Sequence, residues 1–403
     1  MYAPQQHLPK EAISIIYLDN AATTKISPKV FAAMTPYLTE EYGNAGAVYQ
    51  LGRQAAAAVQ KAREQAAALF GCPEEHIIFT SGGSESNNTV FAGLRDKLAA
   101  EGKKHLVVSA IEHDSVLKAA QALAQYGFTI TYLYPEPGGA IPPGRVEDAI
   151  QEDTGLCSVM YANNETGVPN DIQEIGQICK AHSVLFHTDC VQAAGQYPLL
   201  MNNRLVDFAS VSSHKIHGPK GIGALYVKEK IFSPLIYGGA DQEFSLRGGT
   251  ENVAGIVGFG QACEDAVKNL QGDIDCILKI KQRFYTALLQ NLSANGCDKA
   301  IIHINGLLPD ACGKVLNLRI DGVDGETLLL MLDANGICAS AGSACQSRES
   351  KPSHVLTAMG LTADEARSSV RVSFSKYNTL EEADKAAWMF ASCIASLRGI
   401  KSE

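Results

Sequence analysis

Two short apolar runs in the middle of the chain each end in a residue that could do chemistry. Val184-Leu185-Phe186 leads into His187-Thr188-Asp189, and Phe208-Ala209-Ser210-Val211 leads into Ser212-Ser213-His214-Lys215. Short apolar runs that stop at polar residues are typical of buried parallel strands. The carboxyl ends of such strands meet at one edge of an open α/β sheet, where ligands bind. The sequence therefore predicts an Asp and a Lys in the same crevice.

An Asp and a Lys in this arrangement suit pyridoxal phosphate. The amine of Lys215 can form a Schiff base with the aldehyde, and Asp189 can keep the pyridine nitrogen protonated so that the ring acts as an electron sink. Ser212 and His214 flank the lysine with a hydroxyl and an imidazole, which suit a phosphate. A structural ion pair at the sheet edge is the alternative, and Asp189 and Lys215 alone do not decide between the two.

A third strand end offers an anion site. His76-Ile77-Ile78-Phe79 has the character of a strand that stops at Thr80-Ser81-Gly82-Gly83-Ser84, and we expect a helix over 89–100. The free N–H groups and the dipole of a helix start both favour a phosphate. Gly83 lets the backbone come close, and Ser84 adds a hydroxyl. An ordinary loop with a helix cap is the alternative.

Two further strand ends carry polar residues. His113 follows the strand Leu106-Val107-Val108-Ser109 and could stack on a flat cofactor, although a surface histidine at a helix start is an equal alternative. Cys157-Ser158-Val159-Met160-Tyr161-Ala162 runs into Asn163-Asn164-Glu165. Amides and a carboxylate directly after a buried strand need partners, which favours site residues there, Asn164 among them.

Cys345 lies among small and polar residues, with Arg348, Lys351 and His354 nearby. An exposed cysteine in basic surroundings is a better thiolate and nucleophile than a buried one. A free surface cysteine without a role is the alternative.

Composition limits the class of protein. The chain has 403 residues, 46% of them hydrophobic and 19% charged, as is ordinary for a globular enzyme. A net charge of −9 argues against broad binding of nucleic acid or anionic membranes. We find neither a signal peptide in residues 1–11 nor an apolar stretch that approaches the roughly 20 residues of a membrane span. Eleven cysteines without paired spacing predict no disulfide framework and no metal site, and they fit a reducing, cytoplasmic compartment.

The remaining pattern predicts a large α/β domain followed by a smaller α+β domain. Helices are expected over 28–39 and 51–70, and over 252–270 and 274–293 after a polar loop at 237–250. A loop of that length inside a compact domain tends to be functional. Residues 315–320 and 370–374 alternate like antiparallel strands, with helices expected over 324–334 and 380–397.

Taken together, these segments resemble the cysteine desulfurases, the NifS/IscS-like branch of the class V aminotransferase family, over nearly the full length of the chain. The matching motifs are Tyr17-Leu18-Asp19-Asn20-Ala21-Ala22-Thr23-Thr24, Phe79-Thr80-Ser81-Gly82-Gly83-Ser84-Glu85-Ser86-Asn87-Asn88, Glu112-His113, Asn163-Asn164-Glu165-Thr166-Gly167-Val168, His187-Thr188-Asp189-Cys190-Val191-Gln192, Ser212-Ser213-His214-Lys215-Ile216-His217-Gly218-Pro219-Lys220-Gly221, Arg247-Gly248-Gly249-Thr250-Glu251-Asn252, Ser343-Ala344-Cys345 and Arg371-Val372-Ser373.

This resemblance implies the fold. It is the pyridoxal-phosphate-dependent transferase fold type I, an α/β fold whose large domain contains a mostly parallel seven-stranded sheet. We expect the large domain over 15–260. We expect residues 1–14 and 261–403 to form the smaller α+β domain, which carries the loop with the catalytic cysteine.

The resemblance also implies roles for individual residues. Lys215 would be the Schiff-base lysine and Asp189 the partner of the pyridine nitrogen, while His113 would stack on the ring and could act as an acid or base. Gln192 would contact the ring hydroxyl, with Asn164 beside it. The phosphate would be held by Gly83, Ser84, Ser212 and His214, and in a homodimer by Thr250 of the other subunit. Arg371, with Asn20, would bind the substrate carboxylate, which a guanidinium can bind with two hydrogen bonds.

In such an enzyme L-cysteine would be converted to L-alanine, and its sulfur would form a persulfide on Cys345. The persulfide would pass to an acceptor or scaffold protein, for iron–sulfur cluster assembly or for nucleic-acid sulfur modification such as DNA phosphorothioation. The spacing from Cys345 to Pro352-Ser353-His354 resembles the group with a long cysteine loop. No direct contact with nucleic acid or membrane is expected.

Two other readings stay open. One is a different fold type I enzyme, such as an aminotransferase or a lyase acting on selenocysteine or cysteine sulfinate. The other is a sulfur-relay scaffold that binds the cofactor but turns over poorly. Two segments depart from the usual pattern: Asn44-Ala45-Gly46-Ala47-Val48-Tyr49 lacks a common histidine, and Gly239-Ala240-Asp241-Gln242-Glu243-Phe244 replaces a glycine-rich Gln/His-Glu-Arg sequence.

Overall fold

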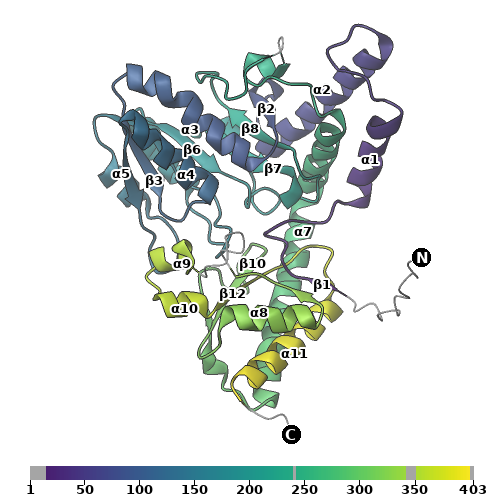
Figure 1. The fold of residues 1–403 in the computed structure, drawn as a ribbon, viewed down its shortest axis with the longest axis vertical. Coiled ribbons are helices and arrows are strands. Elements are labelled where there is room, and N and C mark those ends of the chain that lie inside the picture. Colours follow the sequence, from purple (N-terminus) through teal and green to yellow (C-terminus); the bar gives the residue numbers. More distant parts are fainter. Residues whose placement is uncertain (1–14, 239–241, 342–350, 400–403) are drawn as a thin grey trace, which may run out of the picture.

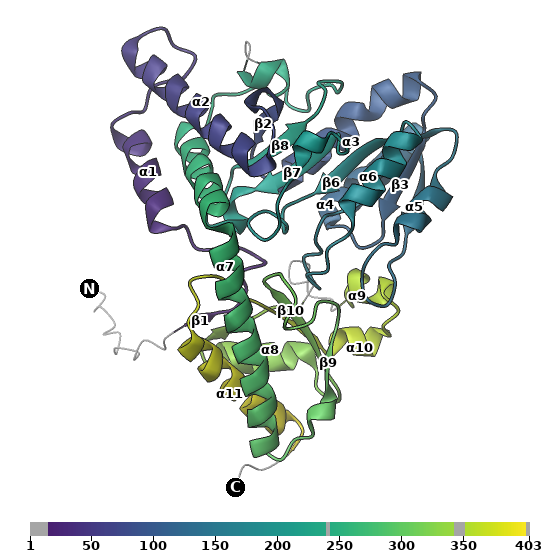
Figure 2. The ribbon, with the colours of Figure 1, turned by 180° about the vertical axis from the view of Figure 1, so that it is seen from behind.

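A computed structural model describes residues 15–238, 242–341 and 351–399 of the chain. Figures 1 and 2 show a larger part built around one sheet and a smaller part below it, with one long helix, α7 (Val253–Ala294), running through both. In the described part of the chain, no helix combines the length and the apolar character needed to cross a membrane.

The larger part contains a seven-stranded sheet. Along the sheet the strands are β2 (Ile77–Thr80), β8 (Gly223–Val227), β7 (Phe208–Ser212), β6 (Leu185–Asp189), β5 (Thr154–Ser158), β3 (His105–Ser109) and β4 (Thr129–Leu133). β8 runs antiparallel to both of its neighbours, and all the other pairs are parallel. The expected mostly parallel sheet of seven strands is confirmed.

Helices cover both faces of this sheet, which is why its strands are apolar on both sides. One face packs against α3 (Gly83–Ala100) and α4 (Asp114–Leu123). The other packs against α2 (Gln50–Phe70), α5 (Pro143–Ala149), α6 (Ile172–Ala181) and the first half of α7. The alternation is visible on β3, where Leu106 and Val108 join the first core and Val107 joins the second.

The smaller part has its own core around an antiparallel sheet. Its strands are β12 (Ser369–Ser373), β10 (Val315–Ile320) and β9 (Ile302–Ile304), and β1 (Ile16–Tyr17) pairs beside them with β11 (Ile337–Cys338). The helices α8 (Gly325–Ala334) and α11 (Leu380–Leu397) pack there with the second half of α7. The prediction of antiparallel strands at 315–320 and 370–374 is therefore confirmed. The remaining α-helices of the described residues are α1 (Pro28–Thr39), α9 (His354–Ala358) and α10 (Ala363–Arg367).

The prediction of two helices at 252–270 and 274–293 is wrong, because α7 is one helix of 42 residues. A single glycine inside a helix costs only about 1 kcal/mol relative to alanine. The helix nevertheless continues through Gly272. Beside it, the Gln271 side chain donates a hydrogen bond to Asp275, one turn further on, at 2.8 Å. The two ends of α7 are buried in different cores, and this packing outweighs the local preference of one residue.

The domain boundary at 260/261 stays a prediction. Some residues on each side of it pack across: Ile16 and Leu18 belong to the core of the smaller part, whereas Val355 and Leu356 of α9 belong to a core of the larger part.

Candidate active site

The carboxyl ends of β6 and β7 lie side by side, because the two strands are parallel and in register. Asp189 is the last residue of β6, and β7 leads directly into a turn of 3-10 helix, Ser213–Lys215. The Asp189 carboxylate is buried and receives hydrogen bonds from Asn87 Nδ2 and the Val191 amide, both at 2.8 Å. These donors fix its orientation. They come from the start of α3 and from the turn after β6.

The amine of Lys215 points at the polar turn that follows β1. Its Nζ donates to the carbonyls of Ala21 and Ala22, at 2.6 and 2.7 Å. Gln192 Nε2 donates to the same Ala21 carbonyl at 2.9 Å. The segment between β1 and α1 thus binds both Lys215 and Gln192, which the family resemblance assigns to the aldehyde and to the ring hydroxyl of the cofactor.

The turn between β2 and α3 has room only for glycine at positions 82 and 83, and we call these two residues the glycine cradle. Gly82 has φ 150°, where L side chains are rare, and Ser212 Oγ would lie 3.6 Å from a Cβ at this position. A Cβ on Gly83 would lie 2.6 Å from a methyl carbon of Val191. The helix begins at Gly83, six residues earlier than predicted, so Ser84 lies in its first turn. The first N–H groups of a helix have no partner within it, and such a helix start favours a phosphate.

Several buried amide oxygens could accept hydrogen bonds from a cofactor. Asn87 Oδ1, Asn164 Oδ1 and Gln192 Oε1 are buried, and none of them has a hydrogen-bond partner among the described residues. Buried polar atoms are normally satisfied, so a group with several polar atoms is expected there. Pyridoxal phosphate fits: a ring with a nitrogen and a hydroxyl matches Asp189 and Gln192, and a phosphate matches the glycine cradle.

His113 is the N-cap residue of α4 and its ring is exposed. Its Nδ1 accepts from the Ser115 amide at 3.1 Å and lies 2.8 Å from Ser115 Oγ. Ser115 Oγ in turn accepts from Asn87 Nδ2 at 2.9 Å. The sequence prediction missed both Ser115 and Asn87 as site residues, because a serine or an asparagine near the start of a helix usually makes local hydrogen bonds to the backbone.

Arg371, on β12 of the smaller sheet, contacts residues next to the strand ends of the larger sheet. Its Nη1 donates to the Asn164 carbonyl at 2.9 Å, and its Nη2 pairs with Asp19 Oδ1 at 2.8 Å. Nε is buried and finds no partner in the ranges that the structure describes. Asn20 Nδ2 donates to the Ser373 carbonyl at 3.0 Å, so Asn20 supports the strand that carries Arg371.

His214 and Thr250, two of the residues expected to bind the phosphate, differ from each other in their surroundings. His214 Nδ1 lies 3.1 Å from Thr23 Oγ1, and burial, together with the charge of Lys215, lowers the pKa of His214 to about 4. The ring is therefore neutral at pH 7. Thr250 is exposed at the end of the loop before α7. No contact among the described residues links it to the glycine cradle, and its role stays a prediction for the homodimer.

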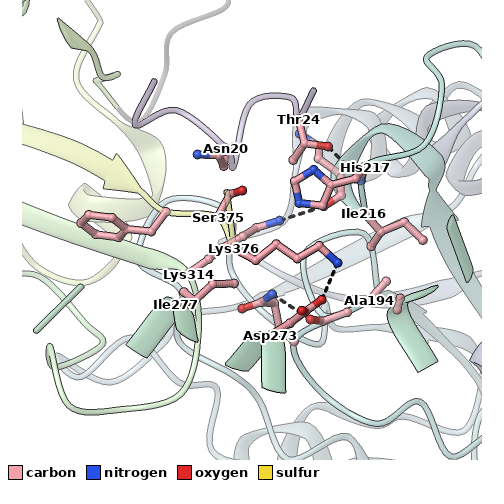
Figure 3. A pocket seen from close by; sticks show the side chains of 15 residues that line it. Asn20, Thr24, Ala194, Ile216, His217, Asp273, Ile277, Lys314, Ser375 and Lys376 are labelled. Carbon is pink, nitrogen blue, oxygen red and sulfur yellow. Dashed lines mark hydrogen bonds and ion pairs between the residues drawn. The ribbon is translucent and has the colours of Figure 1, made fainter. Parts of the chain in front are cut away.

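A buried lysine that the sequence prediction missed lies behind Lys215. Lys314, directly before β10, donates from Nζ to the main-chain carbonyl of Lys215 at 3.2 Å. Burial, reinforced by the charges of Lys215 and Arg371, lowers the pKa of Lys314 to about 7. Lys314, Asn20 and Lys215 line a small cavity of about 30 Å³. Figure 3 shows Lys314 there, near the ion pair of Lys376 and Asp273. A single lysine before a strand is common, so the sequence around Lys314 does not indicate a site residue.

Cys345 and Arg348 lie outside the described residues. Residues shortly after Lys351 contact the strand ends of the site. Ser353 caps α9 and its Oγ donates to the buried carboxylate of Glu165, while His354 Nε2 lies 3.0 Å from the Glu112 carbonyl. These contacts join the segment after Cys345 to the strand ends that carry Asn164 and His113.

A model of the family described as aminotransferase class-V matches residues 16–386. The chain belongs to the class-V aminotransferase family. It is 40% identical to a cysteine desulfurase IscS of Methanosarcina thermophila over 386 residues, which cover 96% of this chain and 93% of the relative. It is also 40% identical to a cysteine desulfurase of a Nostoc species, over 96% of this chain and 95% of the relative.

Solved structures agree with this assignment. A NifS-like protein superposes with a TM-score of 0.85 at 32% identity, covering 96% of this chain and all of the other. SspA in complex with cysteine and DndA from Streptomyces lividans each superpose with a TM-score of 0.74, at 32% and 33% identity, over 90% and 89% of this chain and 99% of each of theirs. The chain is thus a member of the NifS/IscS-like branch, and pyridoxal phosphate is its cofactor.

The cofactor supplies an aldehyde that an amine can bind covalently and a ring that accepts electron density. The protein supplies the rest. Lys215 would provide the amine, and Asp189, which Asn87 and Val191 orient, would provide the negative charge for the ring nitrogen. Arg371, which donates to the Asn164 carbonyl, would provide a guanidinium for a substrate carboxylate.

Proposed function

We propose that this enzyme is a cysteine desulfurase that acts on L-cysteine and carries its sulfur as a persulfide on Cys345. L-cysteine and the Cys345 thiol give L-alanine and the persulfide, so atoms and electrons balance without an external oxidant. Lys215 would move the Cα proton of the substrate, and His113 would serve as a second acid or base.

The observation that carries this proposal is that Lys215 and Arg371 bind the same short segment, at Ala21 and at Asp19, and that Asp189 ends the strand beside the one that leads into Lys215. A lysine and an acid suited to the cofactor lie there beside a guanidinium suited to an amino-acid carboxylate. Cys345 separates this reading from an aminotransferase or a different lyase, because those reactions need no nucleophilic thiol.

The proposal includes a homodimer, in which Thr250 of the partner subunit would join Gly83, Ser84, Ser212 and His214 at the phosphate. It also includes a cytoplasmic location. All ten cysteines in the described part of the chain are free thiols, which suits a reducing compartment. The persulfide would pass to an acceptor protein, for iron–sulfur cluster assembly or for nucleic-acid sulfur modification.

Product analysis tests the reaction. The enzyme with L-cysteine and a reducing thiol should release alanine and sulfide in equal amounts. Cys345→Ser should release no sulfide while it keeps the yellow cofactor, and Cys276→Ser, which changes a half-buried cysteine on α7, should behave like the parent. Sulfide release by Cys345→Ser at the parental rate would refute the proposal. A pull-down with enzyme persulfidated by ³⁵S-cysteine would identify the acceptor.

A further inference from the structure

β2 lies at the edge of the seven-stranded sheet, so one row of its main-chain groups has no neighbouring strand. Side chains take that place. The Ile77 carbonyl accepts from Arg63 Nη1, and the Phe79 amide donates to Glu243 Oε2, both at 2.7 Å. Arg63 and Glu243 also form a two-pronged ion pair at 2.7 and 2.8 Å, and their side chains are only 9% and 5% exposed.

A second ion pair continues the same pattern past the end of β2. The Ser81 amide donates to Glu85 Oε2 at 2.7 Å, and Arg247 Nε pairs with Glu85 Oε1 at 2.9 Å. Main-chain groups at every second position from 77 to 81 are therefore bound by charged side chains. We call the four side chains Arg63, Glu243, Glu85 and Arg247 the edge clasp.

The edge clasp holds a strained loop. Glu243, Phe244 and Ser245 have φ values of 46°, 58° and 62°, three consecutive non-glycine residues in the left-handed region. Each of these conformations is unfavourable and persists only where the surroundings impose it. Glu243 is fixed by Arg63 at the start of this stretch, and Arg247 is fixed by Glu85 two residues after its end.

Both segments that the edge clasp joins lead to the phosphate end of the cofactor site. Ser81 directly precedes the glycine cradle, and Arg247 precedes Thr250, the residue assigned to the phosphate of the other subunit. Figures 1 and 2 show α2, which carries Arg63, next to β2 at this edge. The substrate guanidinium lies on the smaller sheet instead.

We propose that the edge clasp positions the phosphate-binding segments of this enzyme, so that it sets how tightly the phosphate of pyridoxal phosphate is held. Arg63, Glu243, Glu85 and Arg247 are positioning residues that act through the backbone of the cradle and of the loop before Thr250. The inference rests on the cofactor assignment and on the proposed homodimer.

The test uses the double variant Arg63→Met/Glu243→Leu, since removing both charges avoids leaving one buried charge unpaired. Titration of the apoenzyme is followed by the absorbance of the bound aldehyde, with pyridoxal phosphate and with pyridoxal, which lacks the phosphate. We expect the Kd for pyridoxal phosphate to rise about tenfold, as for a small misplacement of binding groups. The Kd for pyridoxal should stay within about twofold of the parental value.

The matched control removes another ion pair of the sheet, Lys228 with Asp207, whose side chains are 20% and 15% exposed. Asp207→Asn/Lys228→Met should bind both aldehydes like the parent. Glu85→Gln/Arg247→Met removes the other ion pair of the edge clasp, whose side chains are 9% and 25% exposed, and serves as the second test if the first double variant folds poorly. It should weaken the binding of pyridoxal phosphate selectively as well.

Unchanged affinity for pyridoxal phosphate, or an equal loss for both aldehydes, would overturn the proposal and leave the edge clasp a purely structural feature. Hydrogen exchange at the Leu246 amide, which donates to the Glu243 carbonyl at 3.0 Å, should speed up in the double variant. Failure of the proposed reaction would show differently, as cofactor binding without sulfide release. Failure of the cofactor assignment would leave the parent unable to bind either aldehyde.

Discussion

Glu112 is a buried carboxyl next to the site residue His113. Ser109 Oγ and the Met160 amide donate to its Oε1, and its Oε2 has no partner among the residues described. Burial raises the pKa of Glu112 to about 8, despite these hydrogen bonds. The group is therefore protonated at pH 7 and supports the start of α4 as a neutral acid.

Glu112→Gln should flatten the pH dependence of stability. In the parent the folded-state pKa lies above that of the unfolded chain. The stabilising effect is complete below about pH 4.5 and is lost as the pH rises to about 8, by up to about 5 kcal/mol. Glutamine is neutral throughout, so urea unfolding at pH 5 to 8 should show a smaller fall. Glu136→Gln, at an exposed glutamate, should keep the parental slope. Parallel curves for Glu112→Gln and the parent would contradict this.

Lys314→Met should have the opposite signature at higher pH. The pKa of Lys314 is about 7 in the folded protein, because of burial and of the charges of Lys215 and Arg371. Between pH 7 and 10 the unfolded chain binds a proton that the folded protein has lost, so parental stability rises with pH. Methionine removes that rise, which amounts to at most about 5 kcal/mol. The exposed Lys25→Met is the control, and an equal rise in both variants would count against the assignment.

At the scale of elements, the cofactor site depends on where strands stop and helices start. β6, β7 and the β2–α3 turn present their ends at one edge of the sheet, so the residues after each strand converge although they are far apart in sequence. The close approach of the β2–α3 turn to Val191, in the turn after β6, is what makes the glycines necessary.

Gly83→Ala should weaken cofactor binding at least about tenfold, since the new methyl group would overlap a methyl carbon of Val191, 2.6 Å away. Adding Val191→Ala should restore much of the affinity, because it removes the overlapping atom. Gly144→Ala, on α5 with open space around the site of the new methyl, should bind like the parent. Apoenzyme titration measures all four proteins. Normal affinity in the Gly83→Ala single variant would show that the turn can shift freely.

At the scale of the whole molecule, α7 joins the two cores between which the site lies. Its first half packs under the large sheet and its second half packs against the smaller one. The relative position of Lys215 and Arg371 therefore depends on α7 being continuous. Gly272, where the sequence predicted a break, is exposed and lies near the middle of the helix.

Changes at Gly272 should separate helix stability from helix continuity. Gly272→Ala has open space for its methyl group, and it should raise the free energy of unfolding by about 0.5–1 kcal/mol without changing the kinetics. Gly272→Pro should lower that free energy by about 3 kcal/mol. It should also raise KM for L-cysteine, since it kinks the link between the cores. An unchanged KM in the proline variant would mean that the cores are held together by other contacts.

The sequence by itself determined the parts of this protein that depend on local pattern. Buried strands, glycine turns and the residues that follow them are visible as apolar runs with polar stops, and they predicted the mostly parallel sheet, with Asp189 and Lys215 at its edge. The motif Asn163-Asn164-Glu165 stood out because such polar groups after a buried strand require partners.

Only the tertiary structure decided the rest, because it depends on contacts between distant segments. Asn87 and Lys314 have ordinary local contexts and become site residues through Asp189 and Lys215, more than 95 positions away in each case. The pairing of Arg63 with Glu243 joins positions 180 apart. The continuity of α7 was decided in the same way. The stabilisation from packing against two cores exceeds the small cost of one glycine in a helix, and this packing cannot be read from the local sequence.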